Sequence, residues 1–224
     1  MQKTVLVTGA NRGIGLALST RLQARGDRVI AVCRQSSEAL ERTGAQVEAG
    51  IDVADDAAIA ALASRLADVR IDVLVLNAGI LTREALGDID TEGFEAMRRQ
   101  FEVNAIGPLR VAQALMERMA DGAKIGIITS RMGSIADNGS GGRYGYRASK
   151  AAVNAIGKSL AVDLKPRGIA VFLLHPGYVA TDMVGGTGDV SPDQAATQLI
   201  ERLDTLTLEQ TGTFWHANGT PLPW

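Results

Sequence analysis

The sequence predicts a single α/β domain, residues 1–224, with a doubly wound parallel sheet covered by helices on both faces. Two observations support this prediction. Short segments rich in valine, isoleucine and leucine alternate with longer helical segments along the chain, and such alternation is typical of parallel sheets. In addition, 224 residues suit one large domain, and no repeat, low-complexity tract or linker divides the chain.

The first expected strand lies in the segment Lys3–Leu18, which reads as a strand, a glycine turn and the start of a helix. The apolar run Val5–Val7 suits a strand buried on both faces, and Gly9, Gly13 and Gly15 follow at once. Glycines at this place let the backbone approach a pyrophosphate, whose charge is met by free amide groups and by the positive end of the next helix. The pattern indicates a Rossmann-type dinucleotide fingerprint, although its spacing is G-x-x-x-G-x-G. On these residues alone, a glycine-rich connection that binds nothing remains open.

The elements that follow keep the alternation. Turn residues, β-branched runs and an alanine-rich run mark their boundaries. We expect strands at Arg28–Cys33, Gln46–Ala49 and Asp72–Leu76, and a helix at Asp55–Ala67.

In the second half, Thr91 is the expected N-cap of a long helical region that runs to about Met119, with an irregularity at Gly107-Pro108. The composition of Asp137–Arg143 indicates a flexible loop. The other expected elements are helices at Tyr144–Leu164 and Pro192–Leu203, and strands at Lys124–Thr129, Ile169–Leu174 and Thr213–His216, which bring the sheet to seven strands.

The composition excludes several classes of protein. Hydrophobic residues make up 46% of the chain and charged residues 21%, with a net charge of −2. No strong positive field would attract nucleic acid or an anionic membrane, and no apolar run is long enough to cross a bilayer. Cys33 is the single cysteine, which excludes an internal disulfide, and the first strand begins too near Met1 to leave room for a secretory signal. We therefore expect a cytoplasmic protein without nucleic-acid or membrane partners.

The notable polar residues stand where the predicted strands end. In a doubly wound sheet, ligands bind outside the carboxyl ends of the strands, so one cleft can hold side chains from several of them. The residues at these ends are Thr8, Cys33-Arg34, Asp52, Asn77, Ser130 and Thr181.

Tyr146 and Lys150 form the sharpest candidate pair. A spacing of four residues places both side chains on one face of the predicted helix. A tyrosine hydroxyl titrates near pH 10, and a neighbouring ammonium lowers that pKa toward the range useful for proton transfer. A solvated Tyr–Lys pair without chemistry is the alternative for this motif alone.

Five motifs taken together resemble the short-chain dehydrogenase/reductase family. Each is weak alone, but their order and their positions at element ends make the joint pattern specific, and the resemblance covers nearly the whole chain. The stretches Ser130–Ser134 and Tyr144–Arg147 and the tail ending at Trp224 are similar to the C-factor-like carbonyl reductases of that family. The five motifs are Thr8-Gly9-x-x-x-Gly13-x-Gly15, Asn77-Ala78-Gly79, Ser130, Tyr146-x-x-x-Lys150 and Pro176-Gly177.

The resemblance implies a hydride transfer between a nicotinamide cofactor and a small-molecule carbonyl or alcohol substrate. It implies that Tyr146 gives its proton to the carbonyl oxygen and that Lys150 lowers the tyrosine pKa and holds the nicotinamide ribose. Ser130 would hydrogen-bond the substrate oxygen, and Asn104 would position a water that connects Lys150 to solvent. The alternative from another class is an NADP(H)-binding regulatory or signalling protein with little turnover.

The position of the serine departs from the family pattern. Ser130 precedes Tyr146 by 16 residues and Ser134 precedes it by 12, whereas the family usually places its serine between these two distances. We prefer Ser130 because it directly ends an apolar strand, and the glycine loop at Asp137–Arg143 can absorb the extra residues. Ser134 stays open as the alternative on loop-length tolerance.

The predicted cofactor is NADP(H). An acidic residue at the end of the second strand usually holds the ribose of NAD, but Cys33 and Arg34 stand there. Arg34, with Arg12 in the glycine turn, can instead clamp the 2′-phosphate. NAD(H) is the alternative, with both arginines as surface charges.

The resemblance also implies the remaining cofactor contacts. Asp52 would lie beside the adenine, with helix capping as its alternative, and Thr181 would meet the nicotinamide carboxamide, again with capping as the alternative. The full expected set is Thr8, Gly9, Asn11, Arg12, Gly13, Ile14, Gly15, Arg34, Asp52, Val53, Asn77, Ala78, Gly79, Tyr146, Lys150, Pro176, Gly177, Val179 and Thr181.

Three further expectations concern partners and metals. Small residues along the helix from Tyr144 would allow close helix packing, and the family commonly dimerises there, so we expect a homodimer or homotetramer. The segment from Thr181 to Ser191, where the family places its substrate lid, is short and glycine-rich, which predicts an open site. His175 and His216 lie in no metal-ligand spacing, so structural roles and no metal are expected.

Overall fold

Seven parallel strands form one sheet in the order β3-β2-β1-β4-β5-β6-β7. The computed structural model describes residues 2–224; residue 1, which the domain prediction includes, lies outside the described residues. The predicted seven-stranded, doubly wound sheet is therefore confirmed. The strands span Thr4–Thr8 (β1), Arg28–Val32 (β2), Gln46–Glu48 (β3), Ile71–Leu76 (β4), Met119–Ile128 (β5), Ala170–His175 (β6) and Thr213–His216 (β7).

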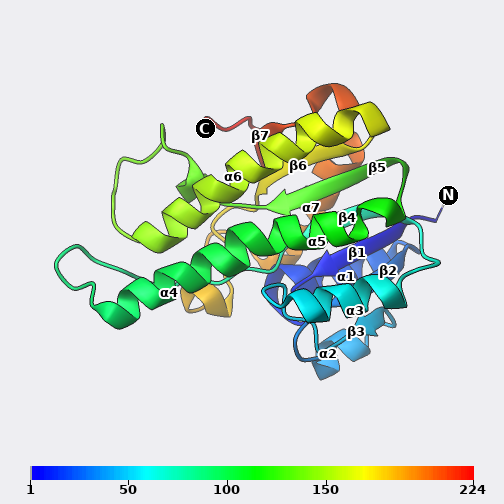
Figure 1. The fold of residues 1–224 in the computed structure, drawn as a ribbon, viewed down its shortest axis with the longest axis horizontal. Coiled ribbons are helices and arrows are strands. Elements are labelled where there is room, and N and C mark those ends of the chain that lie inside the picture. Colours follow the sequence, from blue (N-terminus) through cyan, green and yellow to red (C-terminus); the bar gives the residue numbers. More distant parts are fainter. Residues whose placement is uncertain (1) are drawn as a thin grey trace.

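Helices cover both faces of this sheet. The helices α3, α5 and α6 lie in front of the sheet in Figure 1, and α1 and α7 pack together behind it. The strand order reverses between β1 and β4, so the cleft of a doubly wound sheet is expected at their carboxyl ends. The helices span Gly13–Ala24 (α1), Glu38–Glu41 (α2), Asp56–Arg65 (α3), Thr91–Phe101 (α4), Gly107–Leu115 (α5), Tyr144–Leu164 (α6) and Pro192–Thr205 (α7).

The core consists of one apolar layer on each side of the sheet. Leu6 of β1 packs into the layer under α3, α5 and α6, whereas its neighbours Val5 and Val7 pack into the layer under α1 and α7. Because successive side chains of a strand point to opposite faces, a strand buried on both sides must be apolar throughout. Each such side chain contributes roughly 1.5–3 kcal/mol by leaving water. The sheet therefore holds the loops at its carboxyl edge on a rigid support.

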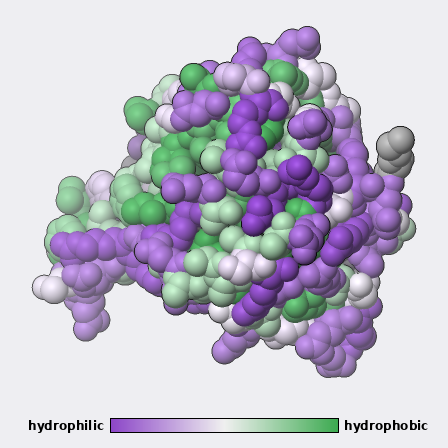
Figure 2. Space-filling model, turned by 45° about the vertical axis from the view of Figure 1, so that its right-hand side comes forward, coloured by the Kyte–Doolittle hydropathy of each residue, from purple (hydrophilic) through white to green (hydrophobic). Residues whose placement is uncertain are grey.

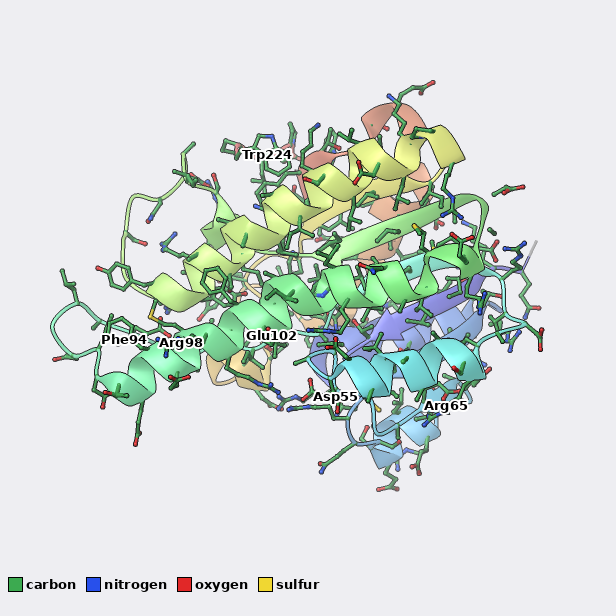
Figure 3. All side chains as sticks on the ribbon, in the orientation of Figure 1. Asp55, Arg65, Phe94, Arg98, Glu102 and Trp224 are labelled. Atoms are coloured by element: carbon green, nitrogen blue, oxygen red, sulfur yellow. The ribbon has the colours of Figure 1, made fainter. Side chains whose placement is uncertain are left out.

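The N-cap of the long helical region lies one residue earlier than predicted. Asp90, and not Thr91, is the N-cap of α4, because its carboxylate accepts a hydrogen bond from the Gly93 amide at 2.8 Å. A carboxylate is also favoured there by the positive end of the helix. The α4 arm projects beyond the sheet in Figure 1, and Phe94 and Arg98 lie on it in Figure 3. At the left of Figure 2 the same arm has a mixed hydrophobic and hydrophilic surface.

A π-helical segment, Glu102–Ile106 (η1), joins α4 to α5. The predicted irregularity at Gly107-Pro108 thus lies one turn earlier in the chain. Pro108 has no N–H to bond the main-chain oxygen of Asn104 four residues before it, so the preceding turn widens. Gly107 lets this wide turn pack closely against Val53, because a Cβ on Gly107 would lie 2.9 Å from Val53 Cγ2.

Two other elements differ from the sequence prediction by more than two residues. The strand β5 begins at Met119 and not at Lys124, because Met119 pairs with Ile71 before a shift in register. The helix α2 was not predicted; it has four residues, capped by the Ser37 hydroxyl, and so short an element has no readable periodicity. In the described part of the chain, none of the helices combines the length and apolar composition that crossing a membrane requires.

Candidate active site

A cleft of about 1040 Å³ opens at the carboxyl edge of the sheet. Its walls come from the segments that follow β1 to β6, together with one face of α6 and residues of α4 and η1. This volume suits an extended ligand and a second small molecule beside it. Most of the predicted site residues line it: Gly9, Asn11, Arg12, Gly13, Ile14, Arg34, Asp52, Val53, Asn77, Ala78, Gly79, Ser130, Tyr146, Lys150, Pro176, Gly177, Val179 and Thr181.

The glycine turn between β1 and α1 has the geometry of a phosphate cradle. Gly9 and Gly13 have φ angles of +66° and +53°, a region that favours glycine. A Cβ on Gly15 would lie 2.2 Å from the Gly9 oxygen, so only glycine lets α1 begin this close to the turn. Asn77 Nδ2 donates to the main-chain oxygens of Thr8 at 2.9 Å and Gly9 at 3.2 Å. The turn is thereby held open toward the cleft, and these residues fit the pyrophosphate of a dinucleotide.

Three predicted site residues lie behind the cleft wall. Gly15 is buried under the turn. The Thr8 hydroxyl accepts hydrogen bonds from the amides of Asn77 and Ala78 at 3.0 and 3.1 Å, so it joins the ends of β1 and β4 and does not face the ligand space. Asn104 is the third, and each of the three acts by positioning residues that line the cleft.

Asn104 lies in the π-helical segment η1 and is buried. Its side-chain oxygen accepts a hydrogen bond from the Ile80 amide at 2.8 Å, and its Nδ2 donates to the Ile80 oxygen at 2.9 Å and to Ser149 Oγ at 3.1 Å. These bonds tie η1 both to the end of β4 and to α6. The side chain makes no direct hydrogen bond to Lys150, whose Nζ donates to the Ile128 oxygen instead, so the water position stays a prediction.

Ser130, Tyr146 and Lys150 meet at one end of the cleft. Ser130 follows β5, and its hydroxyl accepts a hydrogen bond from the Met132 amide at 3.1 Å. Tyr146 and Lys150 lie one turn apart on α6, with Lys150 Nζ 5.8 Å from the centre of the tyrosine ring. Lys150 Nζ also donates to the Ile128 oxygen at 2.9 Å. A phenol, a hydroxyl and an ammonium in one buried corner can hold a carbonyl oxygen and give it a proton.

The expected lowering of the tyrosine pKa is not found in this structure. The pKa of Tyr146 is raised above its usual value, because burial disfavours the phenolate more than the Ser130 hydrogen bond and the Arg143 charge favour it. Burial likewise lowers the pKa of Lys150 to about 8. Tyr146 is therefore a neutral phenol at physiological pH.

Ser134 is engaged elsewhere. Its hydroxyl donates to the main-chain oxygen of Trp224 at 3.1 Å and accepts from the Asp137 amide at 3.1 Å. It is buried and is not among the residues that line the cleft. This geometry favours Ser130 as the serine that faces a substrate.

The opposite end of the cleft carries three arginines. Arg12 and Arg34 have more than half of their side chains exposed, and their nearest carboxylates are Asp182 at 3.8 Å and Asp52 at 3.9 Å. Arg99 of α4, which the sequence analysis did not select, donates to Asp52 at 2.8 Å. Arg99 lies on a helix that is distant in sequence from Asp52, so no sequence motif indicates their contact. Three cations face two carboxylates here, so the end that would receive an adenosine 2′-phosphate has an excess of positive charge.

Helix capping was the alternative role for Asp52 and for Thr181, and neither side chain caps a helix. Asp52 accepts from the Ala54 amide at 2.9 Å, while Asp55 caps α3. Burial alone would raise the pKa of Asp52, but the Ala54 amide and the Arg99 guanidinium outweigh it and hold the pKa below its usual value. Thr181 makes no side-chain capping bond, and its methyl group lies close to Gly13.

The segment after β6 closes on itself beside the site. Val179 forms a bridge with Val190, and the Ala180 amide donates to the Val190 oxygen at 2.9 Å. Gly188 permits this fold, because a Cβ there would lie 2.4 Å from the Ala180 nitrogen. Asp182 and Val184 of this segment line the cleft, and the expectation of an open site stays a prediction.

His175 faces the cleft, although only a structural role was predicted for it. Its ring packs edge-on against His216, with ring centres 4.9 Å apart. Burial, with smaller effects from nearby cations, lowers its pKa to about 3, so the imidazole is neutral. Among residues 2–224, no group of three or more acidic, histidine or cysteine side chains is placed to hold a metal ion.

The sequence matches the family model of the short chain dehydrogenases over residues 3–191. This chain belongs to the short-chain dehydrogenase family. The match includes the glycine turn and the Ser130, Tyr146 and Lys150 cluster, and it confirms the resemblance on which the site residues were assigned.

Relatives within the family are similar over most of their length. The chain is 44% identical over 227 residues to the 1-hydroxy-2-glutathionyl-2-methyl-3-butene dehydrogenase of Rhodococcus sp. (strain AD45), covering 99% of each chain. It is 42% identical over 157 residues to the C-signal of Myxococcus xanthus, covering 69% of this chain and 93% of that protein. The crystal structure of the NADPH-bound carbonyl reductase from chicken fatty liver superimposes with a TM-score of 0.89 at 30% identity, covering 100% of this chain and 99% of that one.

Lys150 predicts a pH dependence for this short-chain dehydrogenase. Below its pKa of about 8 the side chain is cationic, and above that pH it loses the charge, while the raised pKa of Tyr146 keeps the phenol protonated. We expect kcat for carbonyl reduction to fall as the pH rises through about 8. A kcat–pH profile for reduction measures this, and a reduction rate that stays flat through pH 8 would contradict it.

Proposed function

We propose that this chain is an NADP(H)-dependent carbonyl reductase or alcohol dehydrogenase. The observation that carries the proposal is the placement of Ser130, Tyr146 and Lys150 in the same cleft as the glycine turn. When bound, the cofactor supplies the hydride, which the protein cannot supply itself. A spectrophotometric screen of aldehydes, ketones and quinones with NADPH tests the proposal, and it also measures how tolerant the open rim of the cleft is.

The residues act by holding and moving a proton. Ser130 holds the carbonyl oxygen of the substrate, and Tyr146 gives its phenolic proton to that oxygen as the carbon is reduced. Lys150 keeps a positive charge beside the phenol, which stabilises the phenolate that is left. All three side chains are buried, which limits their contact with water. The rate enhancement then comes from positioning and from a prepared proton donor.

The proposed preference for NADP(H) is supported by the charges at the adenosine end. Cys33 stands where an acidic residue would hold the ribose of NAD, and burial raises the pKa of its thiol. Arg12 and Arg34 face the same end of the cleft with exposed guanidinium groups. The chicken carbonyl reductase, which is similar over the whole chain, is bound to NADPH.

Arg34→Ala should reduce the preference for NADPH. Loss of one charge-assisted contact to the 2′-phosphate is expected to weaken NADPH binding about tenfold or more, while NADH binding changes little because NADH lacks that phosphate. Fluorescence titration of both nucleotides measures the change. Arg42→Ala is the matched control, since Arg42 is exposed at the C-terminal end of α2 and pairs with Glu38. A wild-type protein that binds NADH more tightly than NADPH would overturn the assignment.

A second candidate is an NADP(H)-binding regulatory or signalling protein with little turnover. The similarity to C-signal of Myxococcus xanthus favours it. The two candidates separate when NADPH binding and turnover are measured on the same preparation. Tight NADPH binding with no oxidation across the carbonyl screen would support the second candidate.

The oligomeric state and the location are also proposals. Ala148, Ala155 and Ser159 form an exposed small-residue stripe on α6, which allows a second helix to approach closely and supports a homodimer or homotetramer. The mass of the particle in solution tests this. A cytoplasmic location is supported by the single buried cysteine.

A further inference from the structure

Two arginines at the catalytic end of the cleft have no carboxylate partner among the described residues. Six arginines line the cleft, and four of them contact a carboxylate: Arg12, Arg34, Arg99 and Arg131. Arg143 and Arg147, both half-buried, contact none. The acidic residues that line the cleft are Asp52, Asp137 and Asp182. Asp52 contacts two of the four paired arginines, and Asp137 and Asp182 contact one each. The catalytic end therefore has two uncompensated guanidinium groups.

Arg143 lies next to the reacting residue. It directly precedes α6, and its charge lowers the pKa of Tyr146 against the larger effect of burial. Its guanidinium approaches only the Met132 sulfur, at 3.7 Å, which is a weak acceptor. Its donors are therefore available to a ligand that reaches Tyr146.

Arg147 is one turn further along α6 and is held by neutral groups. Its guanidinium donates to the Gly141 oxygen at 3.2 Å, to Ser140 Oγ at 2.7 Å and to the Met132 oxygen at 3.4 Å. These bonds fix the guanidinium at the wall of the cleft without neutralising its charge. Arg147 thus adds to the positive electrostatic potential at the place where a ligand can contact Arg143.

The backbone at Arg143 is strained. Its φ and ψ angles are 50° and 48°, and among residues 2–224 it is the only residue other than glycine with a positive φ. Arginine has no conformational advantage there, whereas Gly141 and Gly142 just before it do adopt positive φ. Strain held by a side chain that points to a binding site is typical of a functional position.

The nearest buried carboxylate does not explain these charges. Glu84 is buried, but its carboxylate accepts from the Gln100 amide group at 2.8 Å, from Thr82 Oγ1 and from the Gly145 amide. Only its main-chain oxygen meets Arg143, through the Arg143 amide at 3.1 Å. The guanidinium of Arg143 remains without a partner.

We propose that the catalytic end of the cleft selects carbonyl or alcohol substrates that carry a carboxylate, which Arg143 binds and Arg147 attracts. This inference rests on the proposed function, since it names the substrate class of the same site. Guanidinium groups pair with carboxylates through two parallel hydrogen bonds. The carboxylate can belong to a small oxo acid or to a peptide-like conjugate such as a glutathionyl thioether, and the short rim after β6 leaves room for either.

The test compares matched substrate pairs that differ in charge. The first pair is 4-formylbenzoate and its methyl ester, and the second is a glutathione thioether of an unsaturated ketone and its diester, each with NADPH. We expect kcat/KM for the carboxylate to exceed that for the ester about tenfold or more in at least one pair. A preference in the first pair identifies small oxo acids, and a preference in the second pair alone identifies peptide-like conjugates.

Variants of Arg143 then locate the effect. Arg143→Gln should abolish the preference, whereas Arg143→Lys should retain most of it. Both side chains bear the same backbone strain, so a folding defect would affect them equally. Arg98→Gln, on the projecting α4 arm (Figure 3), removes the same charge away from the cleft and is the control.

The outcomes separate this inference from the proposed function. Equal kcat/KM for acid and ester in both pairs, with clear turnover, would overturn the inference and leave the reductase intact. A preference that persists unchanged in Arg143→Gln would also overturn it. If none of the four compounds is reduced although other aldehydes are, the substrate class is wrong; if no carbonyl compound is reduced, the proposed function itself fails.

Discussion

Tyr146→Phe is expected to lower kcat/KM for carbonyl reduction by about 10²–10⁴-fold while NADPH still binds. The substitution removes one oxygen atom from a ring that is almost fully buried against the cleft. The proton that the developing alkoxide needs would then have to come from water, which is not held in place as the phenol is. Steady-state kinetics with any aldehyde identified by the screen measures the loss, and a titration with NADPH measures the binding.

The chain provides a matched control two residues away. Tyr144 begins α6, is 39% exposed and does not line the cleft. Tyr144→Phe removes the same atom from the same helix and should leave kcat/KM within a factor of about two, as expected for a surface substitution. Undiminished turnover in Tyr146→Phe, with normal activity in Tyr144→Phe, would refute the proposed mechanism.

Gly15→Ala is expected to abolish nucleotide binding and to destabilise the fold. The new Cβ would lie 2.2 Å from the Gly9 oxygen and 2.7 Å from Asn77 Nδ2. Relief requires α1 to move away from the turn, which breaks the hydrogen bonds that hold the turn on Asn77. Overpacking of this kind costs about 1–3 kcal/mol, or about 2–4 °C in Tm for each kcal/mol in a chain of this size.

Thermal melts with and without NADPH measure both effects. Gly139→Ala is the control, because Gly139 is exposed and a Cβ there would meet nothing within 4 Å. The wild type and Gly139→Ala should gain Tm on addition of NADPH, and Gly15→Ala should not. A Gly15→Ala protein that is stabilised by NADPH as much as the wild type would show that the turn is not the phosphate cradle.

The helices and strands could be predicted because the local sequence patterns and the tertiary packing favour the same elements. The bounds predicted for α6 (Tyr144–Leu164) and β7 (Thr213–His216) are those observed. A glycine-rich loop precedes α6, and Pro166 and Gly168 follow it, with Gly168 at a φ of +72°. The prediction of seven parallel strands needed no more than continuous apolar segments with helices between them.

The parts that could not be read depend on three-dimensional packing. The wide turn of η1 follows from Pro108, but its use to clamp Ile80 through Asn104 joins residues 24 apart in the sequence. Arg99 reaches Asp52 from a different element. The direction of the Tyr146 pKa was wrong because the spacing to Lys150 says nothing about how deeply the ring is buried. In each case the deciding quantity is a neighbour or a degree of burial that no local pattern encodes.

The corner where β7 ends contains both tryptophans of the chain. Trp224, labelled in Figure 3, stacks on Phe214, and its main-chain oxygen accepts a hydrogen bond from the Ala136 amide at 2.9 Å. Trp215 precedes His216, whose ring touches that of the cleft residue His175. Indole emission overlaps the absorption of a reduced nicotinamide, so energy transfer from this corner would report the arrival of the coenzyme without a label. Tryptophan fluorescence would thus report whether the coenzyme is bound, independently of whether any substrate is turned over.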